Sequence, residues 1–210
     1  MPDTQPIYAL CGLLERNEID GPTFFARFAR ALADLVGCSR AGVWMFVDEG
    51  GSRLLRCIAM YDATLDLMVQ VEDIASAGNG AYLDALLRDD CVVATDARAN
   101  PATVCFLHDY LEPLNIHSLL DVCFSVNGVP FGIFSCEQIG APVAWSLRQL
   151  QLLRQIGSRA SLTLLRAATA SVDTAPGALW ESSSTGRLPG LPTQAAADGA
   201  DDHPVDDLNH

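Results

Sequence analysis

Asp121 is the residue whose position in this sequence most directly suggests chemistry, because it interrupts the otherwise apolar run from Ser118 to Val126. An ionised carboxylate buried without a partner loses several kcal/mol of hydration, so it must be hydrogen-bonded, paired or facing a wet cavity. Two interpretations stay open. Asp121 either accepts hydrogen bonds from buried backbone amides or forms the polar wall of a ligand pocket.

Three further side chains could complete such a pocket. His117 opens the run, Cys123 lies two residues after Asp121, and Tyr82 lies in an earlier helical segment. Polar side chains that face otherwise apolar strands are typical of small-molecule sites. We therefore expect a pocket between the run that carries Asp121 and the segment 62–82, lined by Asp121, Tyr82, His117 and Cys123.

Asp96 and Arg98 lie two positions apart in a turn-rich segment before a predicted helix. Their opposite charges favour a charge-assisted clamp that fixes the loop, and a role in the pocket is the alternative. His108 and His117 could each bind a metal or haem iron, but a lone histidine is more often a hydrogen-bonded structural residue. The sequence shows no Gly-rich phosphate loop, Ser-His-Asp arrangement or metal-spaced cluster, so it does not indicate an enzyme.

The strongest structural signal is the hairpin that must position Asp121. Two β-rich runs, Ser118–Val126 and Val129–Cys136, are joined by Asn127-Gly128, a dipeptide that readily takes positive φ and suits a tight turn. Both runs are apolar nearly throughout. We expect the hairpin in the middle of a sheet, with helices on one face and loops or a pocket on the other.

Apolar periodicity predicts the elements around this hairpin. Gly37 should end one helix, and Ser146 with Gln149 forms a capping box for the last helix. Residues 75–80 indicate a mobile loop that could act as a lid. The resulting order predicts an α+β fold with a central antiparallel β-sheet flanked by helices. Helices are expected over 5–17, 22–36, 81–88, 102–111 and 146–168, and further strands over 41–47, 54–61, 67–71 and 91–94.

The last helix has two apolar stripes, which is more than one face of a sheet can cover. We expect the N-terminal segment to cover the second stripe in a helical bundle, within one chain or across a two-fold dimer axis. The chain thus divides into an N-terminal helical segment (1–19), a domain (20–168) and an acidic tail (169–210) expected to be disordered. The stripes are Leu150, Leu153, Ala160 and Leu164, then Leu152, Ile156 and Thr163, and the covering residues are Ile7, Leu10 and Leu14.

The amino-acid composition limits the classes of partner that this chain is expected to bind. Of 210 residues, 13 are basic and 26 acidic, which gives a net charge of −13, and none is lysine, so a nucleic acid or an anionic membrane is not an expected partner. The sequence has no signal peptide and no apolar run of roughly 18 residues, which favours the cytoplasm. The seven cysteines include no C-x-x-C pair and are expected to be mostly buried, reduced thiols.

A set of stretches in the second half of the chain has a familiar pattern. They are Val93–Thr103, Tyr110–Ile116, Ser118–Asp121 and Gly128–Ile133, followed by Glu137, Pro142 and Trp145. Together they resemble the GAF domain, and in particular the GAF sensory domains upstream of bacterial histidine kinases and diguanylate cyclases. The resemblance covers roughly residues 21–168 and implies a GAF/PAS-like fold that binds a small molecule or dimerises, without naming a ligand or cofactor. In this group an aspartate is common at the position of Asp121.

Because an acidic tail follows the last helix in place of a kinase or cyclase domain, we expect a free-standing sensor without an output domain. It would signal as a homodimer or through a separate histidine kinase or diguanylate cyclase. Bilin-binding GAF domains suggest an alternative, attachment of a chromophore through Cys105. Those domains usually carry a Cys-His pair, whereas Phe106 follows here. A second alternative is the free methionine-(R)-sulfoxide reductase, which needs a thiol of low pKa and a resolving cysteine. Its Val-Cys-Gly segment and strand-entry cysteine are missing.

Overall fold

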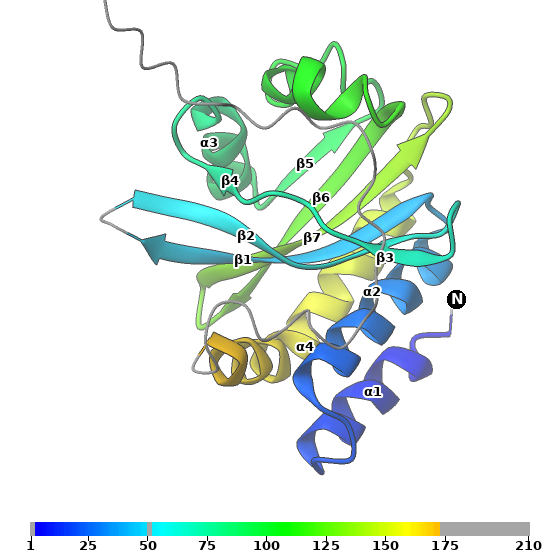
Figure 1. Cartoon of the computed structure of the whole chain (residues 1–210), viewed down its shortest axis with the longest axis vertical. Helices are drawn as coiled ribbons and strands as arrows, with labels where there is room; N and C mark the ends of the chain where they lie inside the picture. Colours follow the sequence, from blue (N-terminus) through cyan, green and yellow to red (C-terminus); the bar gives the residue numbers. More distant parts are fainter. Residues whose placement is uncertain (1–2, 50–51, 173–210) are drawn as a thin grey trace, which may run out of the picture.

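The computed structural model describes residues 3–49 and 52–172, and within them the chain forms one antiparallel sheet between two unequal layers. Figure 1 shows α1, α2 and α4 grouped on one side of the sheet and α3 on the other. This confirms the predicted α+β fold. The helices are α1 (Gln5–Glu15), α2 (Gly21–Val36), α3 (Gly80–Asp89) and α4 (Leu147–Val172), with a 3-10 turn η1 (Val104–Phe106) and a π-helical turn η2 (Leu107–Leu111).

The central hairpin lies where the sequence predicts it. The hairpin strands β6 and β7 are neighbours in the strand order β3-β2-β1-β7-β6-β5. Strand β4 lies outside this order and pairs with β2. Asn127 and Gly128 turn the chain with φ values of 52° and 77°, the left-handed conformations that a two-residue hairpin loop requires. The strands are β1 (Arg40–Glu49), β2 (Ser52–Asp62), β3 (Leu67–Val69), β4 (Ile74–Ala75), β5 (Cys91–Ala94), β6 (Ile116–Val126) and β7 (Val129–Ile139).

Helices α2 and α4 cover one face of the sheet with a continuous apolar core. Asp20 caps α2 by accepting a hydrogen bond from the Thr23 amide at 2.8 Å, and Gly37 ends it with φ 72°. The predicted capping box of α4 is confirmed, because the Ser146 amide donates to Gln149 Oε1 at 2.9 Å and the Gln149 amide donates to Ser146 Oγ at 3.3 Å. These local signals fix the residues at which α2 begins and ends and at which α4 begins.

The N-terminal helix α1 packs against α2 and α4 in the same chain, which confirms the predicted bundle within one chain. Ile7 is fully buried in the shared core. Thr163 Oγ1 donates to Glu15 Oε1 at 2.7 Å, and the Arg159 guanidinium lies 5.2 Å from the Tyr8 ring centroid. Helix α1 therefore shares one core with α2 and α4, and it contacts the second stripe of α4 at Thr163. Dimerisation stays a prediction.

Two predicted elements differ from the structure. The segment 102–111 forms η1 and η2 instead of a regular α-helix, because both of its ends are tethered: the Thr103 hydroxyl donates to the Ala97 carbonyl and Arg98 Nη2 donates to the Leu111 carbonyl. Residues 74–75, at the start of the predicted loop, form β4 by pairing with Leu54 and Leu55.

Helix α4 continues to Val172, past its predicted end. From residue 173 the predicted disordered tail lies outside the described residues. No helix in the described ranges is long and apolar enough to span a membrane.

Candidate functional site

A cavity of about 340 Å³ lies on the face of the sheet opposite α2 and α4. Side chains alternate along a strand, so Phe134 and Cys136 face the helices while Asp121, Ser135 and Glu137 face the cavity. The pocket therefore lies between the central hairpin and the segment 62–82, as expected. The sheet contributes Arg40, Trp44, Leu119, Asp121, Ser135 and Glu137, and the cover contributes Gln70, Val71, Glu72, Asp73, Ile74, Asn79, Cys105, Phe106, Asp109, Tyr110, Pro113 and Leu114.

Asp121 lines this cavity with one of its two carboxylate oxygens unpaired. The Tyr82 hydroxyl donates to Asp121 Oδ2 at 2.8 Å, but Oδ1 is buried without a hydrogen-bond partner in the described structure. Burial raises the pKa of Asp121 to about 7, although hydrogen bonds from Ser135 and Tyr82 oppose this. These hydrogen bonds come from side-chain hydroxyls instead of backbone amides, and Asp121 is also one of the residues that line the cavity.

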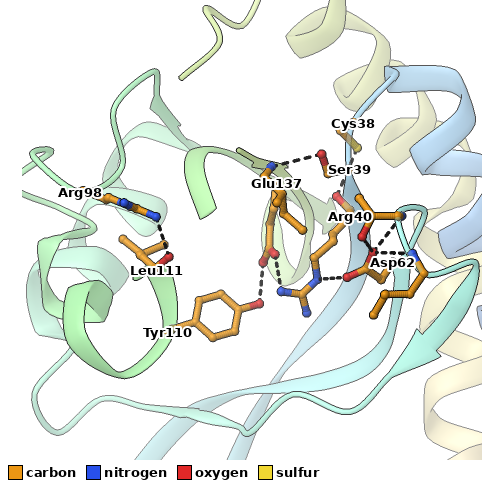
Figure 2. A network of polar contacts seen from close by, with 11 residues as sticks. Cys38, Ser39, Arg40, Asp62, Arg98, Tyr110, Leu111 and Glu137 are labelled. Carbon is orange, nitrogen blue, oxygen red and sulfur yellow. Dashed lines mark hydrogen bonds and ion pairs between the residues drawn. The ribbon is translucent and has the colours of Figure 1, made fainter. Parts of the chain in front are cut away.

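Figure 2 shows a buried ionic network around Arg40, which lines the same cavity as Asp121. Arg40 Nη1 lies 3.0 Å from Glu137 Oε2, and Arg40 Nε lies 3.5 Å from Asp62 Oδ2. The Tyr110 hydroxyl donates to Glu137 Oε1 at 2.7 Å, and burial together with the Glu137 charge raises the pKa of Tyr110 well above its usual value. The network joins β1, β2, β7 and η2, so it fixes the cavity wall to three strands.

Aromatic side chains form much of the remaining wall. Trp44 is 3 % exposed, and its indole Nε1 has no hydrogen-bond partner among the described residues. Phe106 packs edge-on against the Tyr82 ring with centroids 4.9 Å apart. The cavity thus combines apolar ring surface with an unpaired donor on Trp44 and an unpaired acceptor on Asp121.

The structure does not bring all predicted pocket residues together. Tyr82 is buried behind the cavity wall and acts through its hydrogen bond to Asp121. His117 and Cys123 lie outside the lining, which corrects the prediction. The register shift between Ile116 and Ser118 makes His117 a bulge residue, whose Nε2 contacts Asn115 Oδ1 at 3.1 Å.

Cys123 shares the cavity face of β6 but packs under α3, where its thiol donates to the Leu86 carbonyl at 3.6 Å. Burial, with the Asp90 and Asp121 charges, raises its pKa to about 12. All seven cysteines are free thiols. Within the described residues no group of three potential metal ligands comes together, and His108 contacts Glu112 at 3.0 Å.

Asp96 and Arg98 hold the loop before η1 and do not line the cavity. The Arg98 amide donates to Asp96 Oδ1 at 3.1 Å, while its guanidinium donates to the carbonyls of Ile116 and Leu111 at 2.8 and 3.2 Å. The clamp exists, but it joins Arg98 to backbone carbonyls instead of pairing the two charges.

Sequence reasoning missed Arg40, Trp44 and Tyr110 as site residues and mentioned Glu137 only within the family resemblance. Arg40 and Glu137 are opposite each other in the β1–β7 register. Each is a charged residue at the end of an apolar strand run, which is a signal that could have identified them as a buried pair.

Comparison with known proteins gives one family and many similar folds. The family model described as GAF domain matches residues 20–164, and no curated protein matches the chain. Among solved structures, the GAF domain of the cyanobacteriochrome TePixJ is 21% identical, with a TM-score of 0.55 over 71% of this chain and 92% of that chain.

Two further structures share the fold. The phycocyanobilin-bound GAF domain from a cyanobacterial phytochrome is 11% identical, with a TM-score of 0.63 over 80% of this chain and 97% of that chain. A type II free methionine-R-sulfoxide reductase from Thermoplasma acidophilum is 18% identical, with a TM-score of 0.51 over 70% and 93%. At such identities the likeness extends to the fold alone.

Proposed function

Because this chain belongs to the GAF domain family, whose model matches residues 20–164, we propose that it is a cytoplasmic sensory protein that binds a small molecule in the cavity opposite α2 and α4. One observation carries the proposal: Asp121 lines a cavity of about 340 Å³, and its buried Oδ1 has no hydrogen-bond partner among the described residues. A donor on a bound ligand would supply that missing hydrogen bond.

Binding would be transmitted through the strands that separate the cavity from the helices. Ser135 and Glu137 line the cavity, and Phe134 and Cys136 on the same strand lie in the core under α2 and α4. A ligand that displaces β7 would therefore change the packing of α4. The output would leave through association, either as a homodimer or with a separate histidine kinase or diguanylate cyclase.

Mass spectrometry of the full chain under native conditions, after expression in the source cell, tests the proposal. We expect a retained small molecule that is lost from Asp121→Leu, while the unfolding free energy changes only modestly. Asp84→Leu, at an exposed position on the outside of α3, is the matched control and should retain the ligand. Equal loss of binding and stability in Asp121→Leu would favour a purely structural carboxylate.

Cys105 supports a second candidate, covalent attachment of a bilin. Its side chain is exposed and lines the cavity, and a phycocyanobilin-bound GAF domain shares the fold. Coexpression with phycocyanobilin synthesis should then give a coloured chain whose colour survives denaturation. Cys105→Ser should remove the colour and Cys91→Ser should keep it. A colourless wild type would contradict this candidate.

The thiol reductase has less support. Among the described residues, Cys105 is the one cysteine in the cavity lining, so the lining contains no second thiol that could form a disulfide with it. Partial desolvation of the thiol also raises the pKa of Cys105, whereas an attacking thiol is helped by a low pKa. Turnover of free methionine sulfoxide by the purified chain would revive this candidate.

A further inference from the structure

The buried charges beside the cavity do not balance. Arg40 is 2 % exposed and contacts two carboxylates, Glu137 and Asp62, which are 2 % and 5 % exposed. Asp121, also 2 % exposed, adds a third carboxylate without a cationic partner. Buried ions are normally paired. One guanidinium for three carboxylates leaves this region short of positive charge.

The cavity wall has the same deficit. Among the described residues, Arg40 is the one basic residue in the lining. The lining also contains the carboxylates of Glu72, Asp73 and Asp109 and the two buried carboxylates of Asp121 and Glu137. Asp73 is neutralised from outside by Arg56 Nε at 2.9 Å. A phosphate or carboxylate ligand would meet no free cation here, because Arg40 is already held by its two acidic partners.

Two unpaired atoms indicate the complementary groups on a ligand. Asp121 Oδ1 needs a hydrogen-bond donor, and Trp44 Nε1 needs an acceptor or remains against an apolar group. Trp44 and Phe106 contribute aromatic rings to the lining, and such rings attract cations as well as apolar groups. The Tyr110 ring already has the Arg40 guanidinium 5.6 Å from its centroid. The ligand that satisfies all of these is a donor-bearing cation with an apolar body.

We propose that the cavity binds a small protonated amine, whose ammonium group donates to Asp121 Oδ1 and whose apolar or aromatic body lies against Trp44 and Phe106. This rests on the proposed role of the cavity as the sensor site and specifies its ligand class. The ammonium supplies the missing positive charge, and each hydrogen bond to a carboxylate is of the strong, charge-assisted kind. The described lining residues include no basic side chain that is free to bind an anion, because Arg40 already contacts two carboxylates. The cavity should therefore select against anionic metabolites.

Isothermal titration calorimetry of the full chain with three matched probes tests this class. Phenethylamine, 2-phenylethanol and phenylacetate share one ring and differ in the charge at the end of a short chain. At about pH 8, where Asp121 is ionised, we expect phenethylamine to bind about 10-fold or more tightly than 2-phenylethanol, and phenylacetate not to bind. Asp121→Asn should remove the amine preference, and Glu112→Gln, an exposed residue outside the lining, should keep it.

The Trp44 indole N–H resonance in an NMR titration locates the binding independently of charge. If the alcohol or the acid shifts this resonance at concentrations equal to or lower than the amine, the cavity remains the site and the amine class is wrong. If none of the three probes shifts it at millimolar concentration, both the amine class and the cavity as a sensor site are contradicted. Retention of the amine preference in Asp121→Asn would also overturn the proposal.

Discussion

The two faces of the central hairpin belong to the same strands but bury opposite kinds of side chain. Toward α2 and α4 the strands present Leu120, Val122 and Phe134, which are fully buried and apolar. Toward the cavity the next residues along are Asp121 and Ser135, which are also nearly inaccessible. One sheet thus places the apolar side chains that stabilise the fold on one face and the polar side chains that line a cavity on the other.

The energetic consequences of burial have opposite signs on the two faces. A fully buried large apolar side chain contributes roughly 1.5–3 kcal/mol, and the helix face gains this repeatedly. A buried carboxylate lowers stability unless its charge and lone pairs find partners, and the cavity face leaves some of them unpaired. Substitutions at neighbouring positions of one strand should therefore act in different ways.

The largest effect is expected on the helix face. Phe134→Ala should lower the free energy of unfolding by about 3–5 kcal/mol, because the ring is fully buried between Phe28 and Phe124 at centroid distances of 5.7 and 4.8 Å. Urea denaturation measures this change. Val129→Ala, at a position 56% exposed, is the control and should stay within about 0.5 kcal/mol. A small effect of Phe134→Ala would mean that the helix face is loosely packed.

Asp121→Asn should change how stability depends on pH. Burial raises the pKa of Asp121 from 3.8 to about 7, and the groups that act on it are Tyr82 on α3 and Ser135 and Glu137 on β7. The folded state thus holds this proton more tightly than the unfolded state. The stability that it contributes is complete below 3.8 and is lost as the pH rises to about 7.

Urea denaturation of both proteins across this pH range isolates that contribution. Wild type should lose roughly 3 kcal/mol relative to Asp121→Asn between the two ends of the range. Asparagine still accepts the Tyr82 hydrogen bond but carries no charge, so the other titrating groups cancel in the comparison. A difference that stays constant with pH would show that Asp121 is better solvated than its burial indicates.

The smallest effect is expected at Glu137, a carboxylate on the cavity face whose charge is paired with Arg40. Glu137→Gln should lower the unfolding free energy by about 1–2 kcal/mol, because the amide oxygen still accepts from Tyr110 while Arg40 loses one of its two counter-charges. Glu49→Gln removes an exposed contact with Arg56 at 2.8 Å and should change little. If Glu137→Gln stabilised the chain, the excess negative charge would outweigh the pair.

Most of the fold could be predicted because its signals are local. Asn127-Gly128 specifies the hairpin turn, Gly37 ends α2, and Ser146 with Gln149 starts α4. The segment 102–111 was harder, since its apolar spacing is helical but its geometry depends on Arg98 and Thr103, whose partners come from other parts of the chain.

The position of the cavity could be predicted from the sequence, but few of the residues that line it could. Asp121 could be identified because a carboxylate interrupts an apolar run, and Tyr82 was named without its hydrogen bond to Asp121, which joins positions 39 residues apart. Arg40 and Glu137 meet only through the β1–β7 register. His117 lies at a bulge in β6, and no residue type near it in the sequence indicates that bulge.

The alternation of side chains from Ile133 to Glu137 on β7 restricts how the length of this chain can vary. One residue inserted between Ile133 and Phe134 would exchange the two faces beyond it, bringing Phe134 into the cavity and Ser135 and Glu137 under the helices. The Asn127-Gly128 turn has no slack to absorb the shift, because its two residues close the β6–β7 register. Insertions and deletions in related chains should therefore avoid this hairpin and fall in the loops at the outer strands.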